Sequence, residues 1–308
     1  MAEKKKYTVV IPLFNKSSTI DRSIDSVLAQ GHDVEIIIVD DGSTDDGVRR
    51  VLARNDPSIR LIQQTNQGVS SARNAGIFAS KNELVALLDA DDEWQEGFLD
   101  TIDALVEEHP NAGAYTTSFV KMYSDGARYP QNTKIKHPYA GVLNYFHCAR
   151  YGDFFNASSI VVRREAMQRI DGFNPTIKIG EDYDAWGRLA LLYPIAHDSQ
   201  VKVIYHFEGK EHATYLPRPI TESFIDHAIN HLSSEPVQND DLMKYVDFLI
   251  NKFAWRNIFS GYPAQARHIL KKKPVQNISI KRSLIFLLTF VPTSFILFVR
   301  AVSWKIRT

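Results

Sequence analysis

Three carboxylates follow an apolar, strand-like run in the stretch LVALLDADDEW, residues 84–94. Asp89, Asp91 and Asp92 fall within four residues, and like charges this close repel one another, so a compensating positive group is expected. Alternate carboxylates on a turn can face one hard cation, and Mg²⁺ and Mn²⁺ prefer oxygen ligands and complete their shells with substrate phosphates. A solvated acidic turn that caps the next helix is the alternative. The position directly after an apolar strand favours the cation site.

Two more carboxylates, Asp40 and Asp41, end the apolar run VEIIIVD. A carboxylate at a strand end can accept hydrogen bonds from a base N–H or a ribose hydroxyl, and a purely structural turn is an equal alternative. Ser43 and Asp46 follow at the spacing of a capping box, which predicts the start of the next helix.

Arg73 and the pair Glu181–Asp182 are the other residues suited to chemistry. Arg73 lies about one turn into a helix predicted to begin near Gly68, where it would pair with phosphate oxygens or orient the acidic cluster; an ordinary bridge to surface carboxylates is the alternative. Glu181 and Asp182 begin a predicted amphipathic helix, whose dipole favours ionised carboxylates. An ionised carboxylate at the edge of a site suits a general base, and simple helix capping is the alternative.

Apolar runs and helical patterns alternate along the first 120 residues. Strands are predicted over 7–14, 34–40, 59–64, 83–89 and 112–120, and helices over 17–30 (opened by a Ser18–Asp21 capping pair), 43–53, 68–80 and 98–109. This alternation predicts an α/β fold, a doubly wound, mixed but mostly parallel sheet flanked by helices. Ligands bind beyond the carboxyl ends of such strands. The polar groups at 15–16, 40–41 and 89–92 should therefore converge on one rim.

Length and composition set the remaining bounds. A chain of 308 residues accommodates one large domain and an appendage, and we predict a catalytic domain over 1–214 and a helical extension over 215–308. Lys plus Arg equals Asp plus Glu at 36 each, so no basic field recruits nucleic acid. The single cysteine, Cys148, excludes an internal disulfide. The apolar run before Asn15 is too short for a signal peptide, which predicts a cytoplasmic protein.

The C-terminal stretch SLIFLLTFVPTSFILFV, residues 283–299, contains no charged residue and is flanked by lysines and arginines. As a straight helix it would reach about 26 Å, short of a hydrocarbon core of roughly 30 Å, and Pro292 favours a kink. Basic flanks suit an anionic cytoplasmic membrane surface. We predict a shallow, peripheral membrane anchor near 283–304; helices packed on the catalytic domain or on a second subunit of an oligomer, and a single transmembrane span, are the alternatives.

Seven segments together resemble family 2 glycosyltransferases, inverting GT-A-fold enzymes that use nucleotide-sugar donors. They are VVIPLFN, VDDGSTDD, NQGVSSARNAGI, ALLDADDEW, SSIVVRREAM, DGFNP and GEDYDAWGRLA, and they occur in the family's order and spacing over residues 7–207. The resemblance implies nucleoside contacts, usually to uridine, from Pro12, Phe14, Asn15, Asp40 and Asp41, and donor contacts from Arg73, Asp89 and Ala90. It implies a divalent cation, Mn²⁺ or Mg²⁺, on Asp91, with His206 brought back to the diphosphate or metal; an unremarkable loop histidine is the alternative, and His212 is the less favoured candidate.

The same resemblance implies that Asp182 is the catalytic base, with Glu181 the less favoured choice. The Gln-x-x-Arg-Trp signature of processive synthases is absent after residue 182, which favours transfer of one sugar per encounter. The acceptor would be a glycan or a lipid-linked sugar in bacterial surface-polysaccharide synthesis, at the cytoplasmic face of the inner membrane. The competing functions are a sugar-phosphate nucleotidyltransferase and a non-catalytic nucleotide- or glycan-binding module.

Overall fold

The computed structural model describes residues 7–130, 134–207, 219–220, 224–234, 239–272 and 280–292, together with 294 and 296. The chain forms two compact units: Met1–Pro175 with Ala185–Gly209, and Thr176–Asp184 with Lys210–Thr308. This division differs from the predicted single boundary after residue 214 in two respects, the first being that its last break follows Gly209. Residues 176–184 group with the C-terminal helices, although they lie within the predicted catalytic domain.

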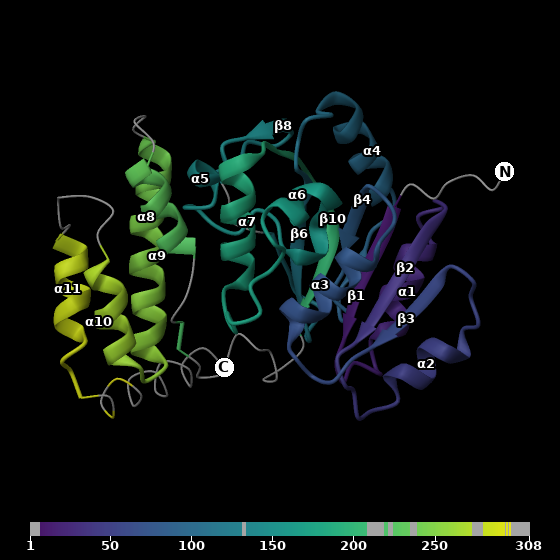
Figure 1. Ribbon diagram of the computed structural model, residues 1–308, viewed down its shortest axis with the longest axis horizontal. Coiled ribbons are helices and arrows are strands. Elements are labelled where there is room, and N and C mark those ends of the chain that lie inside the picture. The colour runs from purple at the N-terminus through teal and green to yellow at the C-terminus, as the bar shows by residue number, and fades with distance from the viewer. Residues whose placement is uncertain are drawn as a thin grey trace. The chain divides into compact units, whose positions relative to one another are not determined.

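Strands and helices alternate through the first unit, as the sequence pattern predicts (Figure 1). In chain order the elements are β1 (Tyr7–Leu13), α1 (Ile20–Leu28), β2 (Val34–Asp40), α2 (Gly47–Ala53), β3 (Ile59–Gln63), α3 (Val69–Ala79), β4 (Leu84–Leu87), β5 (Glu93–Trp94), α4 (Phe98–Glu108), β6 (Ala114–Tyr123), β7 (Arg128–Pro130), β8 (Ala140–Leu143), α5 (Tyr145–Cys148), the 3₁₀ turn Ala157–Ser159, β9 (Ile160–Arg163), α6 (Arg164–Arg169), α7 (Glu181–Leu192) and β10 (Ile195–Phe207). Helix α7 begins in the second unit and continues in the first.

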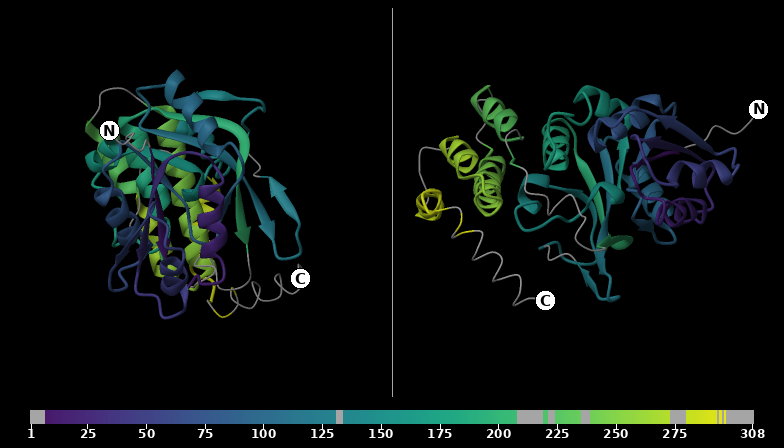
Figure 2. Two further views of the ribbon diagram at one scale, coloured as in Figure 1. Left: turned by 90° about the vertical axis from the view of Figure 1, so that its right-hand side faces the viewer. Right: turned by 90° about the horizontal axis from the view of Figure 1, so that it is seen from below.

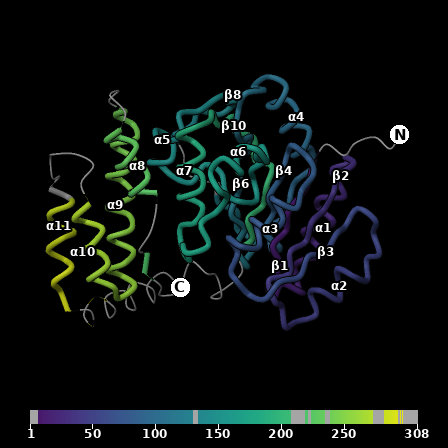
Figure 3. Tube along the Cα trace, in the orientation of Figure 1, coloured from purple at the N-terminus to yellow at the C-terminus, as the bar shows by residue number. Residues whose placement is uncertain are grey.

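The strands of the described chain join in one mixed sheet of order β3-β2-β1-β4-β9-β6-β10-β5, with β7 on β6 and β8 on β10. Strands β3, β2, β1 and β4 are parallel, β9 runs antiparallel to both neighbours, and β10 lies parallel to β6 (Figure 3). The predicted α/β class with a mixed, mostly parallel sheet is confirmed. The strands β5, β7, β8 and β10 were not predicted. The first three are four residues or shorter, whereas β10 is 13 residues long but has a polar stretch at 197–200 that interrupts its apolar pattern.

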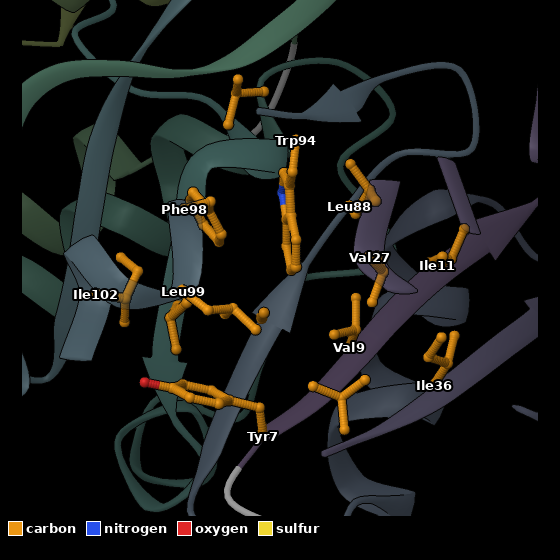
Figure 4. Packing of buried hydrophobic residues seen from close by; sticks show 14 of the residues in the cluster. Tyr7, Val9, Ile11, Val27, Ile36, Leu88, Trp94, Phe98, Leu99 and Ile102 are labelled. Carbon is orange, nitrogen blue, oxygen red and sulfur yellow. The ribbon is translucent and has the colours of Figure 1, made fainter. Parts of the chain in front are cut away.

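Helices cover the two faces of the sheet because β1 alternates its side chains between them. Val9 and Ile11 enter the core cluster that α1 and α4 complete, and in that cluster Trp94 stacks on Phe98 with ring centroids 4.2 Å apart (Figure 4). Val10 points to the other face, toward α3. A Cβ built on Gly76 of α3 would stand 2.3 Å from Val10 Cγ1, so only glycine lets this helix approach β1 so closely.

One face of α1 holds the acidic segment after β4 through hydrogen bonds to its backbone. Ser23 Oγ donates to Asp92 O (2.7 Å), and Arg22 Nη2 donates to Asp91 O (2.5 Å). Further along the same face, Ser26 Oγ accepts from the Trp94 N–H, and Gln30 Oε1 accepts from the Phe98 N–H. Because these groups recur about every turn of α1, a single helix fixes the path from the acidic cluster to α4.

The Asp92 carboxylate joins three distant segments from a fully buried position. Its Oδ2 accepts a hydrogen bond from the Ser158 hydroxyl in the turn before β9, and its Oδ1 accepts from the His206 N–H near the end of β10 (3.1 Å). Ser158 Oγ also accepts from the Asp89 N–H (3.1 Å). Burial, and after it the charges of Asp91 and Asp89, raise the Asp92 pKa well above its ordinary value, although both hydrogen bonds oppose the shift.

Two capping predictions were wrong, because the residues involved form other hydrogen bonds and ion pairs. The helix expected after Ser43 begins at Gly47, whose N–H donates to Asp45, while Asp46 pairs with Arg49. Helix α1 has Thr19 at its N-cap position without a side-chain cap, so the Ser18–Asp21 pair does not cap it. Asp21 instead pairs with Arg50 of α2 and with Arg54, the residue directly after α2.

The second unit is helical, as predicted for the extension (Figure 2). It contains α8 (Phe224–Ser234), α9 (Asp240–Phe259), α10 (Pro263–Lys271) and α11 (Ile280–Leu288), with α8, α10 and α11 each packed on α9. Helix α11 ends four residues before Pro292, where an interruption was predicted. Among the described residues, no helix combines the length and the apolar character needed to cross a bilayer. Most of the predicted anchor beyond Pro292, up to residue 304, lies outside the described residues.

Replacing Asp92 with asparagine should change how stability depends on pH. Since the folded-state pKa of Asp92 is raised above the ordinary 3.8, its stabilising contribution is present below that value and is lost as pH rises through the folded-state pKa. An asparagine amide at this position can still accept from the His206 N–H and donate to Ser158. We therefore expect Asp92→Asn to gain stability relative to the native chain as pH rises above about 4, measured by urea unfolding at each pH.

Asp92→Ala is the matched control for this measurement. It removes both acceptors and leaves the Ser158 hydroxyl and the His206 N–H buried without their partner, so it should be less stable than the native chain by about 2–4 kcal/mol. A stability difference between Asp92→Asn and the native chain that stays constant over the whole pH range would contradict the assignment.

Candidate functional site

The polar groups that follow β1, β2 and β4 meet at one rim of the sheet, as the strand order requires. Leu13 and Asp40 are register partners at the ends of β1 and β2, and the Asp41 N–H donates to Leu13 O (2.8 Å). Lys16, three residues beyond β1, reaches Asp91 beyond β4 with Nζ 2.6 Å from Oδ2. The predicted convergence is therefore found within the first unit.

Asn15 shapes the loop that follows β1. Its backbone has a φ of 51°, in the left-handed region that asparagine tolerates. Its side-chain oxygen accepts from the Thr44 N–H (2.8 Å), and its own N–H donates to Ser43 Oγ (3.1 Å), so the loops after β1 and β2 are tied together. Pro12 is partly buried within β1, whereas the Phe14 ring is 45% exposed. Phe14 thus presents an exposed apolar ring at this rim.

Asp40 and Asp41 are both buried, and the chain uses much of their hydrogen-bonding capacity. Asp40 accepts from the Ser43 N–H (2.9 Å) and from Gln63 Nε2 (3.3 Å). The Asp41 carboxylate accepts from Gln64 Nε2 (2.7 Å) and from the N–H groups of Gln67 and Gly68 (2.8 Å each). A carboxylate has about four acceptor positions. Asp41 therefore positions the loop into α3 and keeps about one acceptor for a ligand, whereas Asp40 keeps about two.

Arg73 compensates Asp89. Its Nη2 lies 2.7 Å from Asp89 Oδ1, and its guanidinium also stands over the Phe173 ring, 5.3 Å from the centroid. The arginine is buried and comes from the second turn of α3, about where the sequence places it. It thus orients the acidic cluster from the inside, one of the two roles predicted for it.

Asp91 has the most exchangeable partner of the three carboxylates. Its side chain is 21% exposed and pairs with the Lys16 ammonium, whose side chain is 43% exposed. Ala90 is buried in the core cluster, so its backbone, and not its side chain, is the part that could meet a donor. The sequence pattern located the acidic residues but missed Lys16 as their counter-ion; its place directly after the strand-ending Asn15 was the available signal.

His206 lies near the end of β10. This strand pairs with the edge strand β5, which directly follows the acidic segment. Its side chain is buried, with Nε2 3.5 Å from Glu93 Oε1, and Glu93 also lies 3.8 Å from Arg22 Nε. The predicted contact of His206 with a metal or diphosphate stays a prediction; His212 lies outside the described residues. Ser158 and Glu93, which sequence reasoning missed, complete these surroundings.

The residues fit a divalent cation that is shared with a substrate. No group of three or more His, Cys, Asp or Glu side chains in the described ranges is arranged to hold a metal by itself. Mg²⁺ and Mn²⁺ sites in nucleotide enzymes commonly use one or two carboxylates together with substrate phosphates. The partly exposed Asp91 carboxylate already binds the Lys16 ammonium, so this position accommodates a positive charge.

Glu181 and Asp182 form the first turn of α7, as predicted, and belong to the second unit, whereas the rim cluster belongs entirely to the first. Asp182 Oδ1 accepts from the Tyr183 N–H (2.8 Å). The Tyr183 hydroxyl in turn accepts from Lys252 Nζ of α9, which also lies 4.3 Å from the Tyr183 ring centroid. Both carboxylates thus stand at the N-terminus of α7.

Comparisons with known proteins find glycosyltransferases that are similar to this chain. The chain is 30% identical over 206 residues to an uncharacterized glycosyltransferase of Nostoc sp., covering 65% of this chain and 62% of that protein. It is 34% identical over 191 residues to the succinoglycan biosynthesis protein ExoO of Rhizobium meliloti, covering 57% and 53%. The chain thus spans little more than half the length of these curated relatives.

Solved structures show the same fold. TarS of S. aureus, residues 1–349 in complex with UDP-GlcNAc, superimposes with a TM-score of 0.68 at 18% identity, over 87% of this chain and 81% of that one. The mannosyltransferase PcManGT of Pyrobaculum calidifontis, in complex with GDP-Man and Mn²⁺, gives 0.56 at 18% identity, over 96% and 83%. The sequence profile described as glycosyl transferase family 2 matches residues 8–170, which hold β1 to β9 and the whole acidic segment. The chain belongs to glycosyl transferase family 2.

Proposed function

We propose that this chain transfers one sugar from a UDP-sugar to a hydroxyl of a glycan or lipid-linked acceptor in polysaccharide synthesis, with inversion at the anomeric carbon. The observation that carries the proposal is the Asp91 carboxylate, which holds an exposed ammonium at 2.6 Å beside the Arg73–Asp89 pair. A divalent cation that shares its shell with a diphosphate suits this position. A related protein named for succinoglycan biosynthesis and solved neighbours that hold UDP-GlcNAc or GDP-Man support the substrate class.

Loops after β1 and β2 would hold the nucleoside. Phe14 presents its ring for stacking on the base, and Pro12 and Asn15 set the backbone on which that ring stands. Asp40 retains acceptor positions for a base N–H or a ribose hydroxyl, while Asp41 acts largely by holding the neighbouring loop. Arg73 and Asp89 would then border the sugar and pyrophosphate.

Asp182 would act as the general base. In its ionised form it takes the proton of the acceptor hydroxyl, whose oxygen forms a bond to the anomeric carbon as the bond to the diphosphate oxygen breaks on the opposite side. The nucleoside diphosphate leaves with the electron pair of the broken bond. A cation on Asp91 would supply charge neutralisation of this leaving group, the task that a carboxylic acid performs in inverting hydrolases. His206 would support the same region through its place beside Glu93.

The competing functions lack comparable support. A nucleotidyltransferase would use a glycine-rich loop after the first strand to cradle a triphosphate, but residues 14–19 contain no glycine, and the chain turns at Asn15 instead. A non-catalytic binding module could keep Asp182 only for helix capping and would show no turnover that depends on it, so the Asp182 experiment below separates it from an enzyme.

Replacing Asp91 with asparagine should remove the dependence of nucleotide binding on metal. Calorimetry with UDP, with and without Mn²⁺, should show tighter binding in the presence of metal for the native chain and no such gain for Asp91→Asn, since a neutral amide is a much weaker cation ligand. Asp46→Asn, which removes an exposed carboxylate from the neighbouring loop, should behave like the native chain. Equal UDP affinity of the native chain with and without Mn²⁺ would defeat the metal assignment.

Replacing Asp182 with asparagine should abolish catalysis while leaving donor binding intact. A panel of nucleotide-sugars identifies the donor by metal-dependent transfer or hydrolysis, and the turnover of Asp182→Asn on that donor should fall by about 10²–10⁴-fold with an unchanged donor dissociation constant. Glu181→Gln is the matched control one residue away and should keep most of the activity. Native-like turnover in Asp182→Asn would refute the base assignment.

We also propose that the second unit attaches peripherally to a membrane, at the cytoplasmic face of the inner membrane. On α11 and the turn after it, Leu284, Leu287 and Phe290 are 58%, 63% and 64% exposed. Their spacing of three residues places them on one side, and Ile285 and Thr289 are buried on the other. The exposed Lys271 at the end of α10 would suit anionic headgroups. An acceptor linked to a lipid would reach the enzyme there.

The triple change of Leu284, Leu287 and Phe290 to serine should reduce binding to vesicles that contain anionic lipid. Loss of three inserted apolar side chains removes several kcal/mol of transfer free energy, so a clear drop in the floated fraction is expected in vesicle flotation. Leu52→Ser, which changes an equally exposed leucine of α2, should float like the native chain. Unchanged flotation of the triple variant would contradict the proposal.

A further inference from the structure

Each carboxylate of the acidic segment is compensated in a different way, and the differences decide which of them can exchange partners. Asp92 is fully buried and receives two hydrogen bonds. Asp89 pairs with Arg73, which is buried and stacked on Phe173. Only the third pair combines two partly exposed side chains, Asp91 at 21% and Lys16 at 43%. An incoming cation can displace an exposed partner far more readily than a buried one.

Lys16 is fixed at its backbone and free to move at its tip. Its carbonyl oxygen accepts from the N–H groups of Thr19 (3.1 Å) and Ile20 (3.0 Å), which anchors the residue at the start of α1. The Asp91 backbone is anchored as well, since its carbonyl oxygen accepts from Arg22. Between these anchored backbones only the four-carbon lysine stem has to move, and the ammonium is a compact charge with freely rotating donors.

We propose that Lys16 is an exchangeable counter-ion that couples metal binding to nucleotide binding. It neutralises Asp91 in the absence of ligand and transfers its charge to the diphosphate when the divalent cation takes Asp91. This inference rests on the metal role proposed for Asp91. A divalent cation alone must displace the ammonium, whereas a cation that arrives with a diphosphate offers the ammonium a second anionic partner, so each ligand assists the other.

The size of the effect follows from the exposure of the pair. Exposed ion pairs are worth about 0.2–1 kcal/mol, which corresponds to an affinity change of about 1.4- to 5-fold. Lys16→Met keeps most of the stem and removes the charge. We expect Mn²⁺ without nucleotide to bind this variant about two- to fivefold more tightly than the native chain, and UDP without metal to bind it more weakly. The strengthening of Mn²⁺ binding by UDP should shrink correspondingly.

Mn²⁺ is titrated into the full chain with and without saturating UDP, and the electron paramagnetic resonance signal reports the free ion. The two titrations give the Mn²⁺ affinity in each state without any turnover. Lys81→Met is the matched control, because it removes the same charge from an exposed lysine that precedes β4, at the other end of that strand. It should bind Mn²⁺ and UDP like the native chain. UDP alone is titrated separately by calorimetry.

The outcomes separate this inference from the function on which it rests. If the native chain binds no Mn²⁺ even with UDP, the metal role of Asp91 fails and the inference fails with it. If UDP strengthens Mn²⁺ binding equally in the native chain and in Lys16→Met, the metal role stands and the coupling role of Lys16 is overturned. Weaker Mn²⁺ binding by Lys16→Met in both states would show that Lys16 merely positions Asp91, which also overturns the proposal.

Discussion

Repulsion among three carboxylates within four residues is the constraint around which the rim of this protein is organised. A different part of the chain compensates each carboxylate. Asp89 pairs with an arginine of α3, and Asp91 pairs with a lysine after β1. Asp92 accepts hydrogen bonds from a serine hydroxyl before β9 and from a backbone N–H of β10. The compensation therefore requires the parallel strands, their crossover helices and the returning strand β10 to be in place together.

The burial of Asp92 and the differing burial of the partners of Asp89 and Asp91 divide the tasks of these carboxylates. Asp92 is buried and serves as an internal link, which stabilises the approach of β9 and β10 to the acidic segment. Asp89 is held by a buried arginine, so its orientation is set in advance of any ligand. Asp91 remains accessible and carries an exchangeable charge, which is the condition for binding a cation and its diphosphate. Three chemically identical residues thus have different tasks: Asp92 links segments of the fold, Asp89 is held in a fixed orientation, and Asp91 can exchange its charged partner.

Much of the fold was predictable because it depends on local patterns. Continuous apolar runs indicate parallel strands buried on both faces, and β1, β2 and β4 lie where such runs occur, whereas β3 and β6 follow interrupted apolar patterns. The short edge strands β5, β7 and β8 escaped prediction, since two to four residues carry too little pattern to distinguish them from loops. The capping predictions at Ser43 and Ser18 were wrong because capping is decided by competition. Ser43 accepts the N–H of Asn15, and Asp21 is drawn to Arg54, which lies 33 residues away in the sequence.

The sequence by itself determined the order of the longer strands and helices as far as β6, the acidic clusters at the strand ends and the amphipathic start of α7, because apolar periodicity and residue type are local properties. Only the tertiary structure decided which charges meet. Lys16 and Asp91 are 75 residues apart, and Asp92 and the His206 N–H are 114 apart; these separations are closed by sheet register and by the face that α1 presents. Ion pairing depends on distance in space and on local burial, and neither quantity can be calculated from residue order before the sheet has formed.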